Sequence, residues 1–294
     1  AGFLATLADL VEHPREGLHT LYISPLKALA VDVRRNLLHP IEEMGLDIRV
    51  ETRTGDTPSD RKARQRARPP HILLTTPESL SLLLSYPESA EMFAGLQRIV
   101  IDEVHAFATG KRGDLLNLAM ARLQALAPQM RRAALSATVA EPELFQRWLA
   151  PKGGTVRLVQ GDAGAPPDLA ILLPEDRVPW AGHSGAYAVP QVMAEIETHQ
   201  TTIVFCNTRG LCELIFQELW KINDHKLPIG IHHGSLDIEA RRKVENAMAD
   251  GRLRALVATA SLDLGVDWGN VDCVIQMGAP KGSSRLLQRI GRAN

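Results

Sequence analysis

Short apolar runs alternate with helix-like stretches along the chain, and this alternation restricts the fold more than any other feature. Strands buried on both faces of a parallel sheet have this pattern when helices separate them. The expected strands are residues 18–24, 48–52, 72–76, 98–102, 133–136, 202–206, 229–232, 255–258 and 271–276. The expected helices are residues 27–43, 115–126, 142–149, 211–222 and 238–248. The sequence therefore predicts an α/β fold with mostly parallel sheets flanked by helices.

The alternation is interrupted once, at residues 151–186, where Pro and Gly are frequent. The chain has 294 residues, about twice the length of a typical domain. Its 45% hydrophobic and 23% charged residues are normal for a globular protein. We therefore expect two α/β domains, residues 1–150 and 187–294, joined by a linker with edge elements at 151–186.

Several classes of protein are excluded by the composition. Cys206, Cys212 and Cys273 are too few for a disulfide framework, and they form no C-x-x-C pair of the kind that binds zinc. No apolar run reaches the roughly 18 residues of a membrane span. The net charge of −1 excludes a strongly cationic nucleic-acid coat, although it permits a local basic cleft. We expect a reducing, cytoplasmic setting and no membrane partner.

Acidic and hydroxyl residues follow two expected strands of the first half. Asp102 and Glu103 end the run Ile99–Ile101, and His105 follows. At the carboxyl end of a parallel strand, one carboxylate can hold Mg²⁺ and its neighbour can orient an attacking water. An ordinary polar loop is the simpler interpretation of this tetrapeptide alone. Ser136 and Thr138 end the next strand, where they either couple a metal site to its surroundings or cap a helix.

Two polar groups near the end of the chain are open to two interpretations each. Gln288, Arg289 and Arg292 suit either an arginine finger, which neutralises γ-phosphate charge, or a solvated basic helix end. The other group follows the expected strand 255–258 and suits either a nucleotide contact or a plain glycine turn. It consists of Thr259, Ser261, Gly265 and Asp267.

Polar loops after other strands suit phosphate binding, because helix starts, hydroxyls and scattered cations supply the donors that phosphates accept. Taken singly, each loop is more simply a turn or a helix cap. These residues are Pro25, Lys27, Thr54, Gly55, Thr76, Pro77, Asn207, Thr208, Arg209, His233 and Gly234. The cationic run at 61–68 either adds phosphate affinity or forms a solvated helix face.

Taken in order, these elements resemble motifs Ia to VI of the superfamily-two DExH-box helicases. The matching strings are YISPLKAL, TRTGD, TTPESL, IDEVHA, LSAT, VFCNTRG, VATASLDLGVD and QRIGRAN. Three longer strings are similar to the Lhr-type branch, and within it to bacterial ligase-associated DExH-box DNA helicases. They are DEVHAFATGKRGDLL, HHGSLDIEARRKVE and GAPKGSSRLLQRIGRAN.

The resemblance implies two RecA-like domains that use ATP and Mg²⁺. By that similarity Asp102 and Glu103 form the metal site, and Glu103 activates the attacking water. The same similarity assigns phosphate contacts to Gln288, Arg289 and Arg292, coupling to His105, Ser136 and Thr138, and nucleotide contacts to Gly265 and Asp267. The implied nucleic-acid path consists of Pro25, Lys27, Thr54, Gly55, Thr76, Pro77, Asn207, Thr208, Arg209, His233, Gly234, Thr259 and Ser261.

The chain departs from the family at its ends. The P-loop string G-x-x-x-x-G-K-[ST], which cradles phosphates in the family, does not occur in the 294 residues. We therefore expect a motor-core fragment, incomplete in both domains, that does not hydrolyse ATP by itself. A natural motor that has lost ATP binding is the alternative.

The resemblance further implies an ATP-dependent DNA helicase or translocase of DNA repair in the bacterial cytoplasm. Its expected partners are single-stranded or branched DNA, together with a DNA ligase or nuclease. One alternative is a helicase for RNA or an RNA–DNA hybrid. The others are an ATP-independent nucleic-acid-binding module and a purely structural α/β domain.

Overall fold

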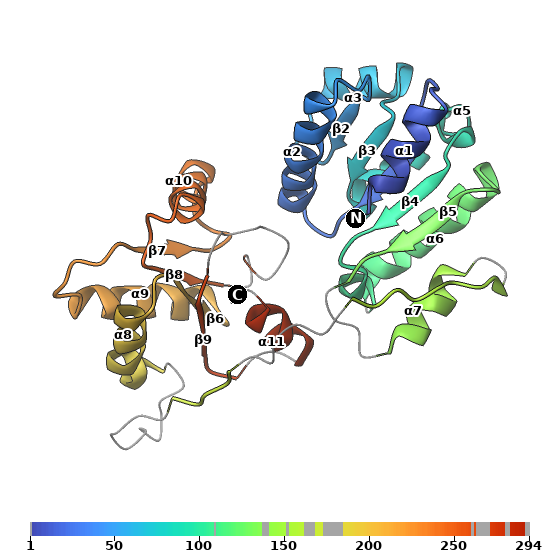
Figure 1. Ribbon diagram of the computed structural model, residues 1–294. Helices are drawn as coiled ribbons and strands as arrows, with labels where there is room; N and C mark the ends of the chain where they lie inside the picture. Colours follow the sequence, from blue (N-terminus) through green and yellow to red (C-terminus); the bar gives the residue numbers. More distant parts are fainter. Residues whose placement is uncertain are drawn as a thin grey trace. The chain divides into compact units, whose positions relative to one another are not determined.

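The computed structural model describes residues 2–108, 110–136, 141–150, 153–161, 168–172, 185–259, 262, 271–279 and 283–291 (Figure 1). The chain divides into two compact units, Ala1–Gln160 and Gly161–Asn294. Five of the expected site residues lie outside the described residues: Thr138, Ser261, Gly265, Asp267 and Arg292.

Unit 1 contains a five-stranded parallel sheet. In chain order its strands are β1 (Thr20–Ile23), β2 (Val50–Arg53), β3 (Ile72–Thr75), β4 (Arg98–Ile101) and β5 (Arg131–Ala134). In space the order is β2-β3-β1-β4-β5, with every neighbouring pair parallel. Because strand order departs from chain order, the connections cross over, and helices cover both faces.

The helices of unit 1 are α1 (Leu4–Glu12), α2 (Lys27–Glu43), α3 (Ser59–Ala67), α4 (Pro77–Leu84), α5 (Ser89–Ala94), the 3₁₀ helix η1 (Val104–Phe107), α6 (Lys111–Leu126) and α7 (Pro142–Leu149). They form two cores, one on each face of the sheet. Leu21 and Ile23 of β1 pack with α4, α5 and α6, whereas Tyr22 packs with α1 and α2. Alternate residues of one strand thus enter opposite cores, which is why the strand is apolar on both faces.

Unit 2 repeats this plan with four parallel strands. They are β6 (Thr202–Cys206), β7 (Ile229–His232), β8 (Ala255–Ala258) and β9 (Cys273–Met277), in the spatial order β7-β8-β6-β9. The helices are the 3₁₀ helix η3 (Ala186–Ala188), α8 (Val189–Thr198), α9 (Arg209–Lys221), α10 (Ile238–Ala249) and α11 (Ser283–Ile290). Val204 and Cys206 face α8 and α9, whereas Ile203 and Phe205 face the other core with Met248 of α10. The predicted fold class, two parallel-sheet α/β domains, is confirmed.

Two sequence expectations need correction. The expected strand 133–136 lies at Arg131–Ala134, because β5 pairs with β4 in a register that opposes Arg131 to Arg98. The described parts of the 151–186 segment, 153–161, 168–172 and 185–186, contain no strand, so no edge strand is found in them. Among the described helices, none combines the length and the apolar character that crossing a membrane requires.

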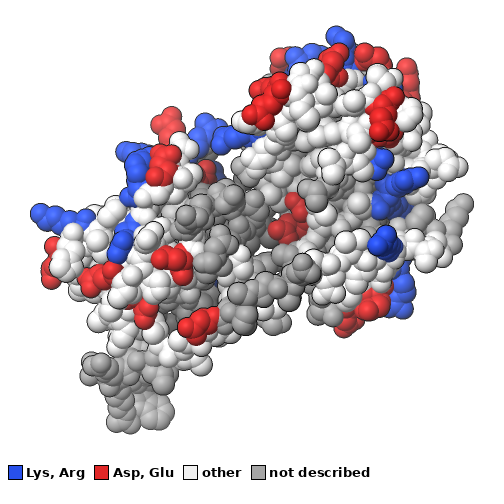
Figure 2. Space-filling model, in the orientation of Figure 1, with Lys and Arg blue, Asp and Glu red and all other residues white. Residues whose placement is uncertain are grey.

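All of the cationic run at 61–68 except its last residue lies in helix α3, and much of its charge is used locally. Arg61 and Arg64 pair with Glu51 of β2 at 3.1 and 3.2 Å, and Lys62 donates to the carbonyl of Gly55. On the face shown in Figure 2, Lys and Arg are interspersed with Asp and Glu. This run is therefore largely engaged in ion pairs and hydrogen bonds within unit 1.

Candidate functional site

The carboxyl end of β4 carries the two adjacent acids. The backbone N–H of Asp102 donates to the carbonyl of Ile23 at 2.9 Å, and Val104 N–H donates to the carbonyl of Leu135 at 3.0 Å. Between them, Glu103 has a φ of 48°, in the left-handed region that side chains other than glycine seldom adopt. This turn ends the strand abruptly and holds both carboxylates at the sheet edge, where ligands bind in open parallel sheets.

Tyr22 fixes one of these carboxylates. Its hydroxyl donates to Oδ2 of Asp102, and the N–H of Glu103 donates to Oδ1 at 2.9 Å. Tyr22 is 1% exposed and lies in β1, adjacent to β4. Sequence reasoning missed Tyr22, because the contact depends on β1 and β4 being neighbours. The only sequence signal was a tyrosine hydroxyl between the apolar residues Leu21 and Ile23.

His105 connects the acids to the next strand. Its Nδ1 lies 2.7 Å from the hydroxyl of Ser136, which follows β5, and 3.5 Å from Oε2 of Glu103. Burial lowers the pKa of His105, although the charge of Asp102 opposes this shift. The structure thus brings together Asp102, Glu103, His105 and Ser136. Carboxylate oxygens are ligands that Mg²⁺ prefers, so the acid pair fits this ion.

The predicted phosphate-binding loops of unit 1 also lie close together. Lys27, at the start of α2, places its Nζ 2.8 Å from Oδ1 of Asp56. The same Nζ lies so close to Gly55 that a Cβ added to this glycine would be only 3.2 Å away. Thr54 and Thr76 are buried. Their hydroxyls are occupied locally, since that of Thr54 accepts from the N–H of Asp56 and that of Thr76 donates to Ser79. Lys27 is therefore the exposed cation of this group.

A further cation links two loops at the same edge. Arg112 of α6 pairs with Glu78 of α4 and donates to the carbonyl of Pro25 at 2.8 Å. Pro25 and Pro77 are both buried beside it. Sequence reasoning missed Arg112, although it lies in the string DEVHAFATGKRGDLL. Its contacts fix the positions of the loops after β1 and β3 relative to each other.

In unit 2, the residues after β6, β7 and β9 are interconnected. Asn207 donates to the carbonyl of Ala279 at 2.7 Å. The Thr208 hydroxyl accepts from the N–H of Leu211 and caps α9. Arg209 of α9 donates to Glu213 at 2.9 Å, and His233 lies 3.4 Å from the same carboxylate. The exposed Gly234 follows His233, and the N–H of Thr259 donates to the carbonyl of His232 at 3.2 Å.

Arg289 is placed inside unit 2. The residue is 1% exposed, its guanidinium lies 4.5 Å over the ring of Phe205, and it donates to Oε1 of Gln276 on β9. Its neighbour Gln288 is half-buried. Because a guanidinium stacked on a buried ring is desolvated, Arg289 helps to hold α11 against the sheet.

Comparison with known proteins agrees with this arrangement. Residues 1–145 match the DEAD/DEAH box helicase family, and residues 187–294 match the helicase conserved C-terminal domain. The ATP-dependent helicase Lhr-Core protein 2 of Thermococcus barophilus is 37% identical over 100% of this chain and 37% of its own length. The Lhr helicase/probable uracil glycosylase of Mycolicibacterium smegmatis is also 37% identical, over 98% of this chain and 22% of its own length.

Solved structures give the same result. The Mycobacterium smegmatis helicase Lhr, bound to ssDNA and AMP-PNP, superposes with a TM-score of 0.82 at 38% identity and covers 99% of this chain and 40% of that one. The DUF1998 helicase MrfA bound to DNA has a TM-score of 0.82 at 28% identity, over 99% of this chain and 42% of its own. The chain thus spans about two fifths or less of these relatives. With its paired acids at the end of β4 and its two RecA-like units, the chain belongs to the superfamily-two helicases, as a member of their Lhr-type branch.

Proposed function

We propose that this chain is the motor core of an ATP-dependent DNA helicase or translocase that moves along single-stranded DNA in DNA repair. The observation that supports this most is the group at the end of β4, where Asp102 contacts Tyr22, and Glu103 contacts His105, which in turn contacts Ser136. A half-buried network that links two acids to the following strand suits a reaction that must be coupled to movement of other parts of the protein.

The residues of this group, together with Thr138, divide three tasks in the proposal. Asp102 and Glu103 hold Mg²⁺, which neutralises charge on the ATP phosphates. Glu103 orients and deprotonates the attacking water. His105, Ser136 and Thr138 transmit the change at the acids to the next strand.

The residues near the C-terminus complete the nucleotide contacts in the proposal. Gln288, Arg289 and Arg292 face the phosphates, and Gly265 and Asp267 contact the nucleoside. Arg289 has a second task, since its stacking on Phe205 also holds α11 in place. Arg292 therefore carries the arginine-finger role, and Arg289 supports its position.

The DNA path in the proposal follows the loops at the strand ends. In unit 1 it includes Pro25, Lys27, Thr54, Gly55, Thr76 and Pro77, and in unit 2 Asn207, Thr208, Arg209, His233, Gly234, Thr259 and Ser261. Such groups contact phosphates and do not read bases. DNA is favoured over RNA because the similar structures at 38% and 28% identity are bound to DNA. We further propose that the motor acts on branched DNA in a bacterial cytoplasm, with a DNA ligase or nuclease as its partner. An RNA–DNA hybrid is the alternative substrate.

The decisive experiment is Glu103→Gln in a protein that includes a P-loop. We expect loss of DNA-stimulated ATP hydrolysis with unchanged, salt-dependent binding to single-stranded DNA. The exposed Glu88→Gln is the matched control and should retain both. Normal ATP hydrolysis in Glu103→Gln would refute the proposed catalytic role. If RNA stimulates hydrolysis more than DNA does, the motor acts on RNA.

We also propose that the 294 residues alone do not turn over ATP, because they contain no P-loop string. A chain of these residues should show no DNA-stimulated ATPase, although it should bind single-stranded DNA. DNA-stimulated hydrolysis by the 294 residues, lost in Glu103→Gln, would contradict this. DNA binding without hydrolysis in the P-loop-containing protein would instead support the ATP-independent binding module.

A further inference from the structure

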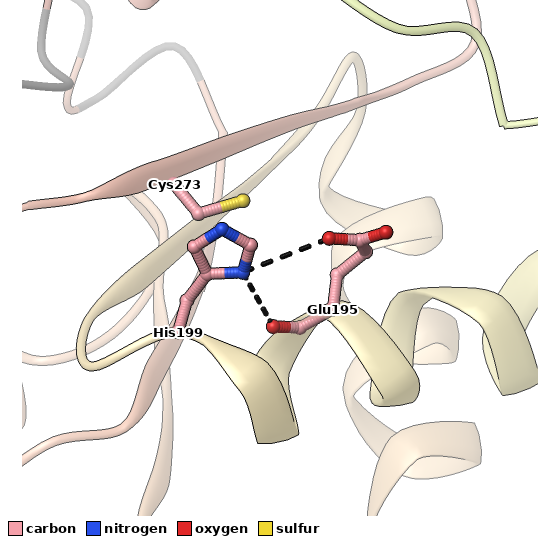
Figure 3. A group of neighbouring side chains, drawn as sticks. All are labelled: Glu195, His199 and Cys273. Carbon is pink, nitrogen blue, oxygen red and sulfur yellow. Dashed lines mark hydrogen bonds and ion pairs between the residues drawn. The ribbon is translucent and has the colours of Figure 1, made fainter.

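Three metal-binding side chains of unit 2 meet where α8 ends and β9 begins. They are Glu195 in the last turns of α8, His199 directly after that helix, and Cys273 at the start of β9 (Figure 3). One ligand atom from each lies within 4.8 Å of the other two. These groups lie at the amino ends of β6 and β9, whereas the helicase motif residues of unit 2 follow the carboxyl ends of its strands.

The hydrogen bonding of His199 leaves one ring nitrogen able to bind a metal. Its Nδ1 lies 2.8 Å from the backbone carbonyl oxygen of Glu195, which can only accept. Nδ1 must therefore carry the hydrogen, and Nε2 keeps its lone pair. Figure 3 shows this second nitrogen on the side of the ring that faces Cys273. Metal-binding histidines commonly donate their other N–H to a carbonyl or carboxylate in this way.

The two segments that carry the ligands are fixed to each other. Asp272 accepts from the N–H groups of Gln200 and Thr201, both at 2.8 Å. The N–H of Cys273 donates to the carbonyl of Thr201 at 3.3 Å. The loop after His199 is therefore held against the start of β9 by the residues next to the ligands, which prepares the group before any ion binds.

The three side chains are partly exposed, so an ion and a water can reach them. The side chains of His199 and Glu195 are 33% and 37% exposed, and Cys273 is half-buried. Burial, reinforced by the charge of Glu195, raises the pKa of the Cys273 thiol. Cys206 and Cys212, in contrast, are 0% exposed. Cys273 is thus the accessible cysteine, and its thiolate is a strong zinc ligand.

We propose that Glu195, His199 and Cys273 bind a zinc ion, with water as the fourth ligand. A thiolate, a neutral imidazole and a carboxylate form a donor set that suits Zn²⁺, and the two negative ligands balance its charge. Donors on one tetrahedral zinc lie about 3.3–3.7 Å apart, and the Glu195 carboxylate lies 3.6 Å from Nδ1 of His199, so binding requires this carboxylate to turn toward the Nε2 side of the ring. The partly exposed Glu195 can make this movement by rotating its side chain. The ion then links α8 to β9 and stabilises unit 2, whatever the enzymatic role of the chain.

The test is metal binding by the chain after treatment with a chelator. We expect one equivalent of Zn²⁺ to bind and to raise the Tm, and Co²⁺ in its place to give a thiolate-to-cobalt charge-transfer band. Because binding releases the thiol proton, affinity should increase with pH. The band and the rise in Tm should be lost in Cys273→Ser and in His199→Gln, and kept in His225→Gln, whose side chain is 73% exposed.

Two variants keep the test decisive if one of them misfolds. Far-UV circular dichroism identifies the folded variant, and either one alone is sufficient because each removes one ligand. Unchanged zinc binding in the folded Cys273→Ser or His199→Gln chain would overturn the assignment. Absence of zinc binding to the parent chain would overturn it equally.

Discussion

The contact between Tyr22 and Asp102 makes a quantitative prediction about unit 1. Tyr22→Phe removes only the hydroxyl that donates to Oδ2 of Asp102 and leaves the ring in its place against Phe3. Asp102→Ala removes the acceptor. The double variant then isolates the contact, because all other effects of the two changes cancel in the cycle.

The expected coupling energy follows from burial. A hydrogen bond to a charged group contributes about 1.5–3 kcal/mol to stability. Tyr22 is 1% exposed but Asp102 is only half-buried, so the lower end of that range applies. We therefore expect Tyr22→Phe to lower the free energy of unfolding of unit 1 by about 1.5 kcal/mol, and the coupling energy to have a similar size.

The assay must report on unit 1 alone. Urea-dependent hydrogen exchange of the β1 and β4 amides does so, since both strands belong to the unit 1 sheet. Tyr86→Phe is the matched control, because Tyr86 is 36% exposed and its ring only faces Arg66 at 4.2 Å. Its effect should stay within about 0.5 kcal/mol. A coupling energy near zero for Tyr22 and Asp102 would refute the contact and its positioning of the acid.

Three further predictions concern packing and pH. Gly113→Ala should destabilise unit 1 by about 3 kcal/mol in urea unfolding, since its Cβ would lie 2.1 Å from the carbonyl oxygen of Phe107. Gly210→Ala is the control and should not destabilise the protein, because the space around Gly210 is open. Equal effects of the two changes would contradict this prediction. Arg289→Ala should cost unit 2 about 3 kcal/mol, because it removes a buried side chain and a hydrogen bond to β9, and an unchanged Tm would contradict the stabilising role of Arg289. Burial lowers the pKa of His232 below 6.5, although a carboxylate on α10 opposes the shift; protonation therefore favours the unfolded state, and the Tm of unit 2 should fall as the pH decreases from about 7 to about 5. His232→Gln should make the decrease of the Tm with pH less steep. An equally steep decrease in this variant would contradict the prediction.

Much of the fold was predictable because it depends on local pattern. The expected helix 27–43 and the expected strands 202–206, 229–232 and 255–258 match α2, β6, β7 and β8 residue for residue. Apolar runs of this length have one stable environment, a sheet covered on both faces. The β5 strand was displaced by two residues, because its position is set by its register with β4 and by no feature of its own.

The candidate site was predictable only in part. The acids at 102 and 103 and the hydroxyl at 136 were found because each follows a recognisable strand. Neither Tyr22 nor Arg112 was found, since the contacts of each depend on which strands are adjacent. The zinc group was missed for the same reason: Cys273 has no second cysteine near it in sequence, and its partners lie at the end of α8 and directly after it, far from Cys273 in the chain.

By itself, the sequence determined which residues form strands and which polar residues follow them, because side-chain periodicity and turn residues act over a few neighbours. Only the tertiary structure decided that β1 lies beside β4 and that β9 lies beside β6. Strand order follows from the crossover connections and the packing of two helical layers, on which a local pattern carries no information. That order places the Tyr22 hydroxyl on Asp102, the Arg289 guanidinium on Phe205 and Cys273 next to His199.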